Sequence, residues 1–182
     1  MTIARPPYLR GDRAPMGDRA RMIRVDQAGE YGATRIYQGQ LAVLRRGRGA
    51  AAVGEMAAQE ERHLAQFDRL VRERRARPTA LSPLWHVAGY ALGAATALLG
   101  ERAAMACTVA VEEAIDAHYA AQEERLEDEP ALRETVARFR AEENEHREIG
   151  LAHGAEQAPG YRVLSAMIKA GCRAAIRISE RL

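Results

Sequence analysis

The sequence predicts an all-α helical bundle, and three observations lead to this fold class. The chain has 182 residues, enough for one domain with its own core, and 47% of them are hydrophobic. Ala, Leu, Glu and Arg dominate, and no apolar–polar alternation of the kind found in strands persists. Gly or Pro interrupts the helical periodicity at five places, which divide the chain into six segments.

The six expected helices follow from these breaks in chain order. The first ends at RRGRGAA, the second at RPTALSP and the third at LLGE, since glycine and proline disfavour a continuing helix. The fourth ends at EDEP and the fifth at EQAPG, and the sixth is amphipathic with Lys and Arg on one side. We therefore expect helices at 24–46, 50–76, 83–99, 101–127, 131–153 and 159–180.

The third helix differs from the others, because residues 83–100 carry no formal charge when His86 is neutral. At about 1.5 Å per residue it almost matches a bilayer core of ~30 Å, but its many Ala and Gly residues make it only mildly hydrophobic. Three interpretations stay open: a buried or half-buried bundle helix, a helix in the membrane interface with Trp85 and Tyr90 at the headgroups, and, least favoured, a transmembrane span.

Charge and cysteine content limit the classes of function and the compartment. A formal net charge of +2 gives no reason to expect a nucleic-acid binder. Cys107 and Cys172 form no close pair, so they are interpreted as small core residues in a reducing compartment. Residues 1–22 are Arg-rich without an apolar stretch, which indicates a flexible arm ahead of a helical domain at 23–182. This pattern favours an arm over a secretory signal, and a cleaved transit peptide is the disfavoured alternative.

Two Glu-x-x-His triples lie far apart in the sequence, one from Glu60 to His63 and one from Glu143 to His146. Residues three apart share a helical face, so each triple can point one carboxylate and one imidazole inward. Taken singly, either triple is more simply a solvated surface, because glutamate is abundant in this chain. The second copy, together with matched residues upstream, favours a functional cluster.

The upstream residues repeat as well. Glu30 lies 30 positions before the first triple, and Glu112 lies 31 positions before the second. A tyrosine follows each of these glutamates by seven residues, at Tyr37 and Tyr119. Seven residues are two helical turns, so each tyrosine lies on the face of its glutamate. The chain therefore contains an internal duplication of helix pairs with polar residues at matched heights.

Neighbouring residues indicate which carboxylates point inward. Glu112 shares its face with largely apolar residues, whereas Glu113 shares its face with Asp116. The first glutamates of the two triples also lie on apolar stripes. Glu142 and Glu145 are expected on the solvated side.

Four-helix carboxylate proteins that bind two metal ions use this set of residues: one Glu from each of two helices and Glu-x-x-His from each of the other two. Four carboxylates and two imidazoles are too oxygen-rich for structural zinc and suit iron or manganese. The four carboxylates carry −4, which two divalent ions cancel; without metal, some would take up protons. The predicted ligands are Glu30, Glu60, His63, Glu112, Glu143 and His146.

Four long segments carry polar detail beyond this spacing: RVDQAGEYGATRIYQGQLAVL, ERHLAQF, PLWHVAGYALGAATALLGERAAMACTVAVEEAIDAHY and FRAEENEHREIGLAHGAEQAPGYRVLSAMIKAGCRAAIRISERL. They resemble the demethoxyubiquinone hydroxylase family of ubiquinone biosynthesis, and the resemblance runs from Arg24 to Leu182. The six ligand positions that the family implies are the six residues chosen by spacing.

The resemblance implies a ferritin-like four-helix bundle with two additional apolar or amphipathic helices. It implies a di-iron monooxygenase that hydroxylates the ring of 3-demethoxyubiquinol (5-methoxy-2-methyl-3-polyprenyl-benzoquinol), with two iron ions per chain, O2 as co-substrate, and NADH or the quinol as reductant. The polyprenyl quinone resides in the membrane, so residues 83–100, with 161–178, are candidates for an apolar surface leading to the metal.

The resemblance also implies a location and partners. A peripheral position is expected on the cytoplasmic face of the inner membrane in a bacterium, or on the matrix face of the mitochondrial inner membrane in a eukaryote. Expected partners are the membrane surface, a lipid-binding accessory protein, a ubiquinone-biosynthesis complex and a second copy of the chain.

Roles outside the ligand set stay open. Tyr37 and Tyr119 fit either core residues or hydrogen-bond donors to ligand carboxylates, and His118, beside Tyr119, is a candidate for electron or proton delivery. An iron store or peroxide scavenger with the same ligands is disfavoured by the absence of rubredoxin-like cysteines and by the uncharged segment. A non-enzymatic membrane adaptor with a surface acidic cluster is disfavoured by the duplicated ligand set.

Overall fold

The structure, a computed structural model, describes residues 17–182, which form six α-helices, one short 3₁₀ helix and no strand. The elements are α1 (Gly17–Leu44), α2 (Arg48–Arg74), α3 (Ser82–Leu98), α4 (Glu101–Glu123), α5 (Pro130–Ala152), η1 (Ala155–Gln157) and α6 (Tyr161–Ser179). The all-α prediction is confirmed, and five of the six helices begin and end within four residues of the predicted bounds.

The first helix is the exception, because it begins at Gly17, seven residues before its predicted start at 24. Met22 is buried in the apolar core, so the start of α1 belongs to the bundle and not to the arm predicted at 1–22. Closely spaced arginines at the start of α1 interrupt the apolar periodicity, so the sequence does not show that this part of the helix is buried. Arg24 is itself buried, and its Nε donates to a backbone carbonyl oxygen after α2 at 2.8 Å. The rest of the predicted arm, 1–16, lies outside the described residues.

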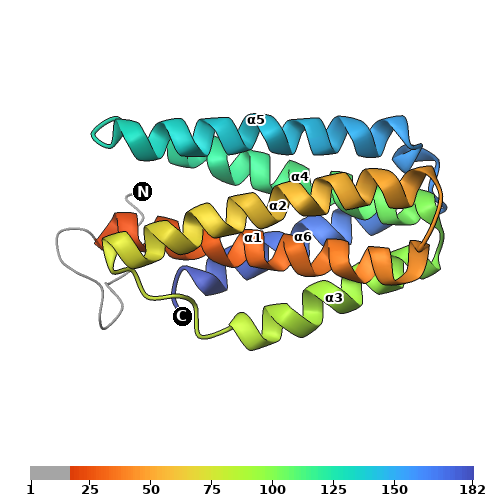
Figure 1. Cartoon of the computed structure of the whole chain (residues 1–182), viewed down its shortest axis with the longest axis horizontal. Helices are drawn as coiled ribbons and strands as arrows, with labels where there is room; N and C mark the ends of the chain where they lie inside the picture. Colours follow the sequence, from red (N-terminus) through yellow and green to blue (C-terminus); the bar gives the residue numbers. More distant parts are fainter. Residues whose placement is uncertain (1–16) are drawn as a thin grey trace.

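Four helices form the bundle, and the other two lie against its sides (Figure 1). α1 pairs with α2, and α4 pairs with α5, along the long axis of the molecule. α3 packs mainly on α1, and α6 packs mainly on α4. The described chain is therefore built from two consecutive three-helix units, α1–α3 and α4–α6, in which the third helix lies against the first. This is the ferritin-like bundle with two additional helices that the family resemblance implies.

Apolar clusters lie at both ends of the bundle and leave a polar layer between them. One cluster includes Ile23, Phe67, Leu126 and Val136, and the other includes Tyr37, Val53, Met105 and Ile149. On each bundle helix, the predicted ligands lie between a residue of the first cluster and a residue of the second. The helices therefore hold the polar residues in a layer closed by apolar packing on both sides.

α3 is a half-buried helix with an apolar outer face. Its buried residues are Gly89, Gly93, Thr96 and Ala97, which face the bundle. Leu84 and Val87 are 53% and 65% exposed. Among residues 17–182, no helix combines the length and the apolar character that a membrane span needs.

Gly93 sets the distance between α1 and α3, because a Cβ at this position would lie 1.9 Å from the Ile36 carbonyl oxygen. Gly93→Ala is therefore expected to destabilise the fold by about 1–3 kcal/mol, since the helices would have to separate. Urea unfolding measures the effect. Gly54→Ala on α2, where a Cβ meets no atom within 4 Å, is the control and should gain stability from the helix propensity of alanine. Equal stability gains in both variants would contradict the close approach.

Candidate metal centre

The six predicted ligands meet in one buried cluster inside the bundle. α1 supplies Glu30, α2 supplies Glu60 and His63, α4 supplies Glu112, and α5 supplies Glu143 and His146. Each of these six residues exposes at most 2% of its surface to solvent. The carboxylates beside them in sequence lie outside the cluster; Glu61 and Glu145 are exposed, and Glu113 pairs with Lys169 at 2.6 Å.

The ligand atoms form two overlapping groups, and the atoms of each group lie within 4.8 Å of one another. The first group contains Glu30, Glu60, His63 and Glu143, and the second contains Glu60, Glu112, Glu143 and His146. Glu143 approaches both imidazoles with separate oxygens, because its Oε1 lies 3.0 Å from His63 Nδ1 and its Oε2 lies 3.0 Å from His146 Nδ1. Two groups that share two carboxylates fit a pair of adjacent metal ions.

Six atoms of the cluster make no hydrogen bond of acceptable geometry to the described residues, although some of them lie close to one another: Glu30 Oε2, Glu60 Oε1, Glu60 Oε2, Glu112 Oε2, Glu143 Oε2 and His146 Nδ1. Buried polar atoms without partners are costly, and folded proteins leave few of them. Metal ions bound between the carboxylates would satisfy these atoms. The mixed oxygen and nitrogen donors fit iron or manganese.

Burial and crowding change the pKa values of the cluster. Loss of solvation, together with repulsion by Glu143, raises the pKa values of Glu60 and Glu112 well above the usual 4.5. Burial also raises the pKa of Glu30. Burial opposes charge on Glu143 and His63 too, but direct contacts prevail there. Contacts with the two imidazoles lower the pKa of Glu143 to about 2, and contacts with Glu143 and Glu30 raise that of His63 to about 10. The metal-free cluster therefore keeps protons on several carboxylates.

Each upstream tyrosine donates a hydrogen bond to the glutamate of the other three-helix unit. Tyr37 on α1 donates to Glu112 Oε1 on α4 at 2.8 Å, and Tyr119 on α4 donates to Glu30 Oε1 on α1. Burial raises the pKa of both phenols well above 10, so they remain donors. The seven-residue spacing placed each tyrosine on the face of its own glutamate, but the hydrogen bond crosses to the opposite unit.

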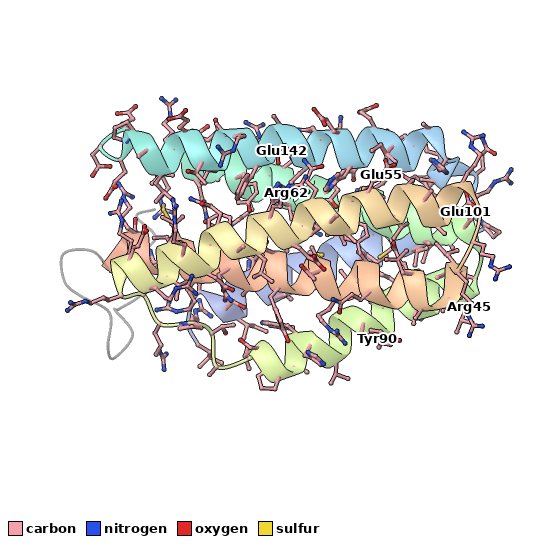
Figure 2. The ribbon with its side chains drawn as sticks, in the orientation of Figure 1. Arg45, Glu55, Arg62, Tyr90, Glu101 and Glu142 are labelled. Carbon is pink, nitrogen blue, oxygen red and sulfur yellow. The ribbon has the colours of Figure 1, made fainter. Side chains whose placement is uncertain are left out.

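The outer nitrogen of each imidazole also contacts the opposite unit. His63 Nε2 on α2 lies 2.5 Å from Glu142 Oε2 on α5, where these two helices run side by side (Figure 2). His146 Nε2 on α5 lies 3.3 Å from Gln59 Oε1 on α2. The prediction that Glu142 is purely solvated is therefore wrong, because its side chain is only 30% exposed and contacts an imidazole of the cluster. Glu142 and Gln59, the partners of the outer nitrogens, each directly precede the first glutamate of a triple. This shared position was the signal for them in the sequence.

His118 lies outside the cluster, in a second polar group beside it. Its Nε2 is 3.1 Å from Oδ1 of the buried Asp26, and Gln122 donates to the same oxygen at 2.6 Å. Burial raises the pKa of Asp26. A polar cavity of about 110 Å³ reaches His118 and Gln122. Sequence reasoning missed Asp26 and Gln122; Asp26 lies one helical turn before Glu30, and Gln122 lies one turn after His118.

An apolar cavity of about 450 Å³ lies between α1, α3, α4 and α6. Its walls include Gly29 and Ala33 on α1, and Val111 and Ile115 on α4. These residues neighbour the glutamates that α1 and α4 contribute to the cluster, so the cavity runs alongside it. Trp85 of α3 also lines the cavity, together with residues of α6. The two segments that the sequence singled out as apolar therefore form its outer wall.

The comparisons with known proteins agree with this arrangement. The family model described as "Ubiquinone biosynthesis protein COQ7" matches residues 18–179. A 3-demethoxyubiquinol 3-hydroxylase of Rhodospirillum rubrum is 64% identical over 178 residues, covering 96% of this chain and 83% of that protein. The NADPH-dependent 3-demethoxyubiquinone 3-hydroxylase, mitochondrial, of Homo sapiens is 55% identical over 167 residues, covering 89% and 77%. The 5-demethoxyubiquinone hydroxylase, mitochondrial, of Saccharomyces cerevisiae is 39% identical over 180 residues, covering 89% and 77%.

The matched region extends to the last residue of α6 and includes both three-helix units. The buried cluster and the cavity beside it lie within this region. Matches of this length and identity show that the chain is a member of the family of ubiquinone biosynthesis protein COQ7.

Proposed function

We propose that this chain is a di-iron monooxygenase that hydroxylates the ring of 3-demethoxyubiquinol with dioxygen, the substrate named for its Rhodospirillum rubrum relative. One observation carries the proposal: a buried cluster of four carboxylates and two imidazoles lies beside an apolar cavity of about 450 Å³. Protein sites for small molecules are mostly apolar cavities of ~300–1,000 Å³ with a few polar groups. A quinol ring with part of its prenyl tail fits this description.

The proposed ligands divide between two iron ions. Glu30 and His63 would hold one ion, Glu112 and His146 the other, and Glu60 and Glu143 would lie between them. Bound iron would supply the activation of dioxygen, which protein side chains alone do not provide. The four carboxylates carry −4 and cancel the charge of two divalent ions.

The other residues keep the cluster in place and dry. The two tyrosine hydroxyls fix the carboxylates of Glu30 and Glu112, so these groups keep their orientation when the charge of the cluster changes. The apolar clusters at both ends of the bundle exclude water from the polar layer. The cavity wall made by Ala33, Val111 and Ile115 would hold the quinol ring next to the cluster.

His118 and Tyr119 are our candidates for delivering electrons or protons. His118 is 17% exposed at its side chain and lines the small polar cavity, whereas Tyr119 bonds directly to Glu30. The two rings lie 6.0 Å apart, between the small polar cavity and the cluster. NADH or the quinol would supply the electrons; the printed name of the human relative specifies NADPH for that protein.

The outer faces of α3 and α6 are our candidate for the membrane-facing surface. Val87 on α3 and Val163 and Met167 on α6 are 65%, 65% and 69% exposed. A quinone with a polyprenyl tail resides in the bilayer, and Met167, which lines the cavity, together with the other exposed apolar side chains of α3 and α6 would let the tail enter from there. The accessory protein, the biosynthetic complex, the homo-oligomer and the membrane face stay predictions.

The competing functions fit the site less well. An iron store or peroxide scavenger needs the metal cluster but has no use for an apolar cavity of about 450 Å³ beside it. The membrane adaptor required an acidic cluster on the surface, whereas the six predicted ligands are buried.

Turnover of a short-chain demethoxyubiquinone analogue tests the proposal directly. The iron-loaded protein, with ¹⁸O2 and NADH or the reduced analogue, is expected to form a product that carries one ¹⁸O atom on the ring, detected by mass spectrometry. Uptake of many iron ions per chain without quinone conversion would favour the iron store instead.

Filling the apolar cavity is expected to block the substrate without disturbing the metal. Gly32 lines the cavity, and a Cβ there meets no atom within 4 Å, so Gly32→Phe adds an aromatic side chain at the cavity wall without a clash at its Cβ. We expect kcat/KM for the quinone analogue to fall at least ~10-fold, because even one added methylene group in an apolar pocket changes kcat/KM by about this factor. The iron content should stay unchanged. Gly54→Phe, on α2 outside the cavity, is the matched control. Equal kcat/KM values for the two variants would exclude the cavity as the substrate site.

A further inference from the structure

The two histidines of the cluster have different outer partners, although the two halves of the site are otherwise alike. Nε2 of His63 lies 2.5 Å from a carboxylate oxygen of Glu142, whereas Nε2 of His146 lies 3.3 Å from the amide oxygen of Gln59. Glu142 and Gln59 hold equivalent positions, each directly before the first glutamate of a triple. The internal duplication therefore places a charged acceptor behind one imidazole and a neutral acceptor behind the other.

We propose that this difference makes the two metal positions unequal, so that the position at His63 binds its divalent ion before, and more tightly than, the position at His146. The inference rests on the proposed function, because it requires a cluster that holds two ions. It assigns Glu142 and Gln59 as positioning residues that act on the metal through the histidines.

The chemistry follows from the proton on the outer nitrogen. An imidazole that binds metal through Nδ1 carries its proton on Nε2 and donates it outward. A carboxylate acceptor makes this hydrogen bond shorter and roughly twice as strong as a neutral one, and it increases the basicity of the ring toward the metal. The glutamine oxygen carries no charge, and its distance of 3.3 Å from His146 Nε2 is beyond the usual range. His63 is therefore the stronger metal ligand of the two histidines.

The other contacts do not offset this difference. Each position has one unshared glutamate that accepts a tyrosine hydroxyl, and both positions share the same two further glutamates. The ring of His63 stacks on Phe139 with centroids 4.0 Å apart and planes at 23°. The ring of His146 meets Tyr37 edge-on at 6.1 Å. Closer stacking holds the His63 ring more firmly in the ligand orientation, which acts in the same direction.

Stepwise removal of metal tests the inference. The full-length protein is loaded with Mn²⁺ without oxygen, and the ions are then removed by competition with a chelator of known affinity. We expect two steps whose dissociation constants differ about 10–100-fold, the range by which outer partners of ligand histidines change metal affinity. After the first step, electron paramagnetic resonance should show an isolated Mn²⁺ in place of a coupled pair.

Reciprocal substitutions assign the steps. Glu142→Gln is expected to weaken only the tighter step, so that the two constants approach each other. Gln59→Glu is expected to tighten the weaker step; because Gln59 also hydrogen-bonds with Glu142, Glu142→Gln is the substitution that decides the assignment. Glu145→Gln changes an exposed carboxylate on the same helix and is the control, expected to leave both constants unchanged.

Three outcomes would overturn the inference. Release of both ions from the wild-type chain in one step, or unchanged constants in Glu142→Gln, would overturn it and leave the two-ion site intact. Absence of binding of both Mn²⁺ and Fe²⁺ would overturn it together with the proposed function. These readouts do not depend on catalytic activity, so a slow or inactive preparation gives the same answer.

Discussion

Glu143→Ala is expected to remove both iron ions and to abolish hydroxylation. Glu143 is shared by the two ligand groups and lies 3.0 Å from the inner nitrogen of each histidine, so its loss removes one donor from both positions at once. Loss of an outer partner alone costs ~10–100-fold in metal affinity or activity, and we expect loss of this shared ligand to cost more than ~100-fold. Iron content should fall from about two ions per chain to a small fraction of one.

Iron analysis, quinone turnover and thermal unfolding measure this prediction in the same preparation. Glu145→Ala removes an exposed carboxylate from the same helix, two residues away, and should retain iron and activity. A Glu143→Ala protein that keeps about two irons would show that Glu143 is not a shared ligand. Absence of iron from the wild-type chain, even after anaerobic loading with ferrous ions, would contradict the proposal of a metal site as a whole.

Removal of the metal is expected to make the stability of the fold decrease as the pH rises from about 6.5 to 10. The carboxyls of Glu30, Glu60 and Glu112 have pKa values raised above 4.5 in the folded protein, mainly by burial. Their protonated forms are therefore retained on folding at a pH where the unfolded chain has lost these protons. Such groups contribute stability that is fully present below the unfolded pKa and is lost as the pH rises through the folded pKa.

His63 acts in the same direction, because burial is outweighed by its contacts with Glu143 and Glu30, which raise its pKa from 6.5 to about 10. Its contribution is lost between these two values. Glu143 acts in the opposite direction, since its pKa of about 2 gives stability that disappears only as the pH falls from 4.5 through about 2. Above pH 6.5 the net effect is therefore a decline, of up to about 1.4 kcal/mol per pH unit for each proton released.

Urea unfolding of the stripped and the iron-loaded protein at several pH values measures this decline. Bound metal keeps the carboxylates ionised, so the loaded protein should show a much flatter dependence over the same interval. Glu60→Gln replaces one protonated carboxyl with a neutral amide of similar shape and should flatten the dependence of the stripped protein. A stripped protein that becomes more stable toward pH 10 would contradict the protonation pattern of the cluster.

The ligands could be predicted from the sequence because metal binding fixes both residue type and spacing. A carboxylate and an imidazole three residues apart must share a helical face, and an apolar stripe around Glu60 or Glu112 shows that this face points inward. Both the spacing and the apolar stripe are properties of a single helix, so they can be recognised directly in the sequence. The positions of the buried Cys107 and the half-buried Cys172 follow from the same periodicity, since Cys172 packs against the apolar cluster that contains Cys107.

Contacts between helices could not be predicted in this way. Glu142 was assigned to the solvent because its own helix places it beside the inward face, but α2 brings His63 to it. The tyrosines were placed near the glutamates of their own helices for the same reason. The start of α1 was missed because its closely spaced arginines are paired with residues distant in sequence, such as Arg19 with Asp128 between α4 and α5. Each of these features depends on how the two units dock, which the spacing along one helix does not contain.

The polar contacts of the centre cross between the two three-helix units: each tyrosine reaches the other unit's glutamate, and each imidazole reaches the residue before the other unit's triple. One unit alone would therefore have tyrosines and histidines without these partners. Two identical copies of such a unit, related by a twofold axis, would supply every one of these contacts to each other. The single chain thus has the internal symmetry of a homodimer whose subunits have been fused, and the exchange of glutamate for glutamine at one outer position is a change that only the fused form permits.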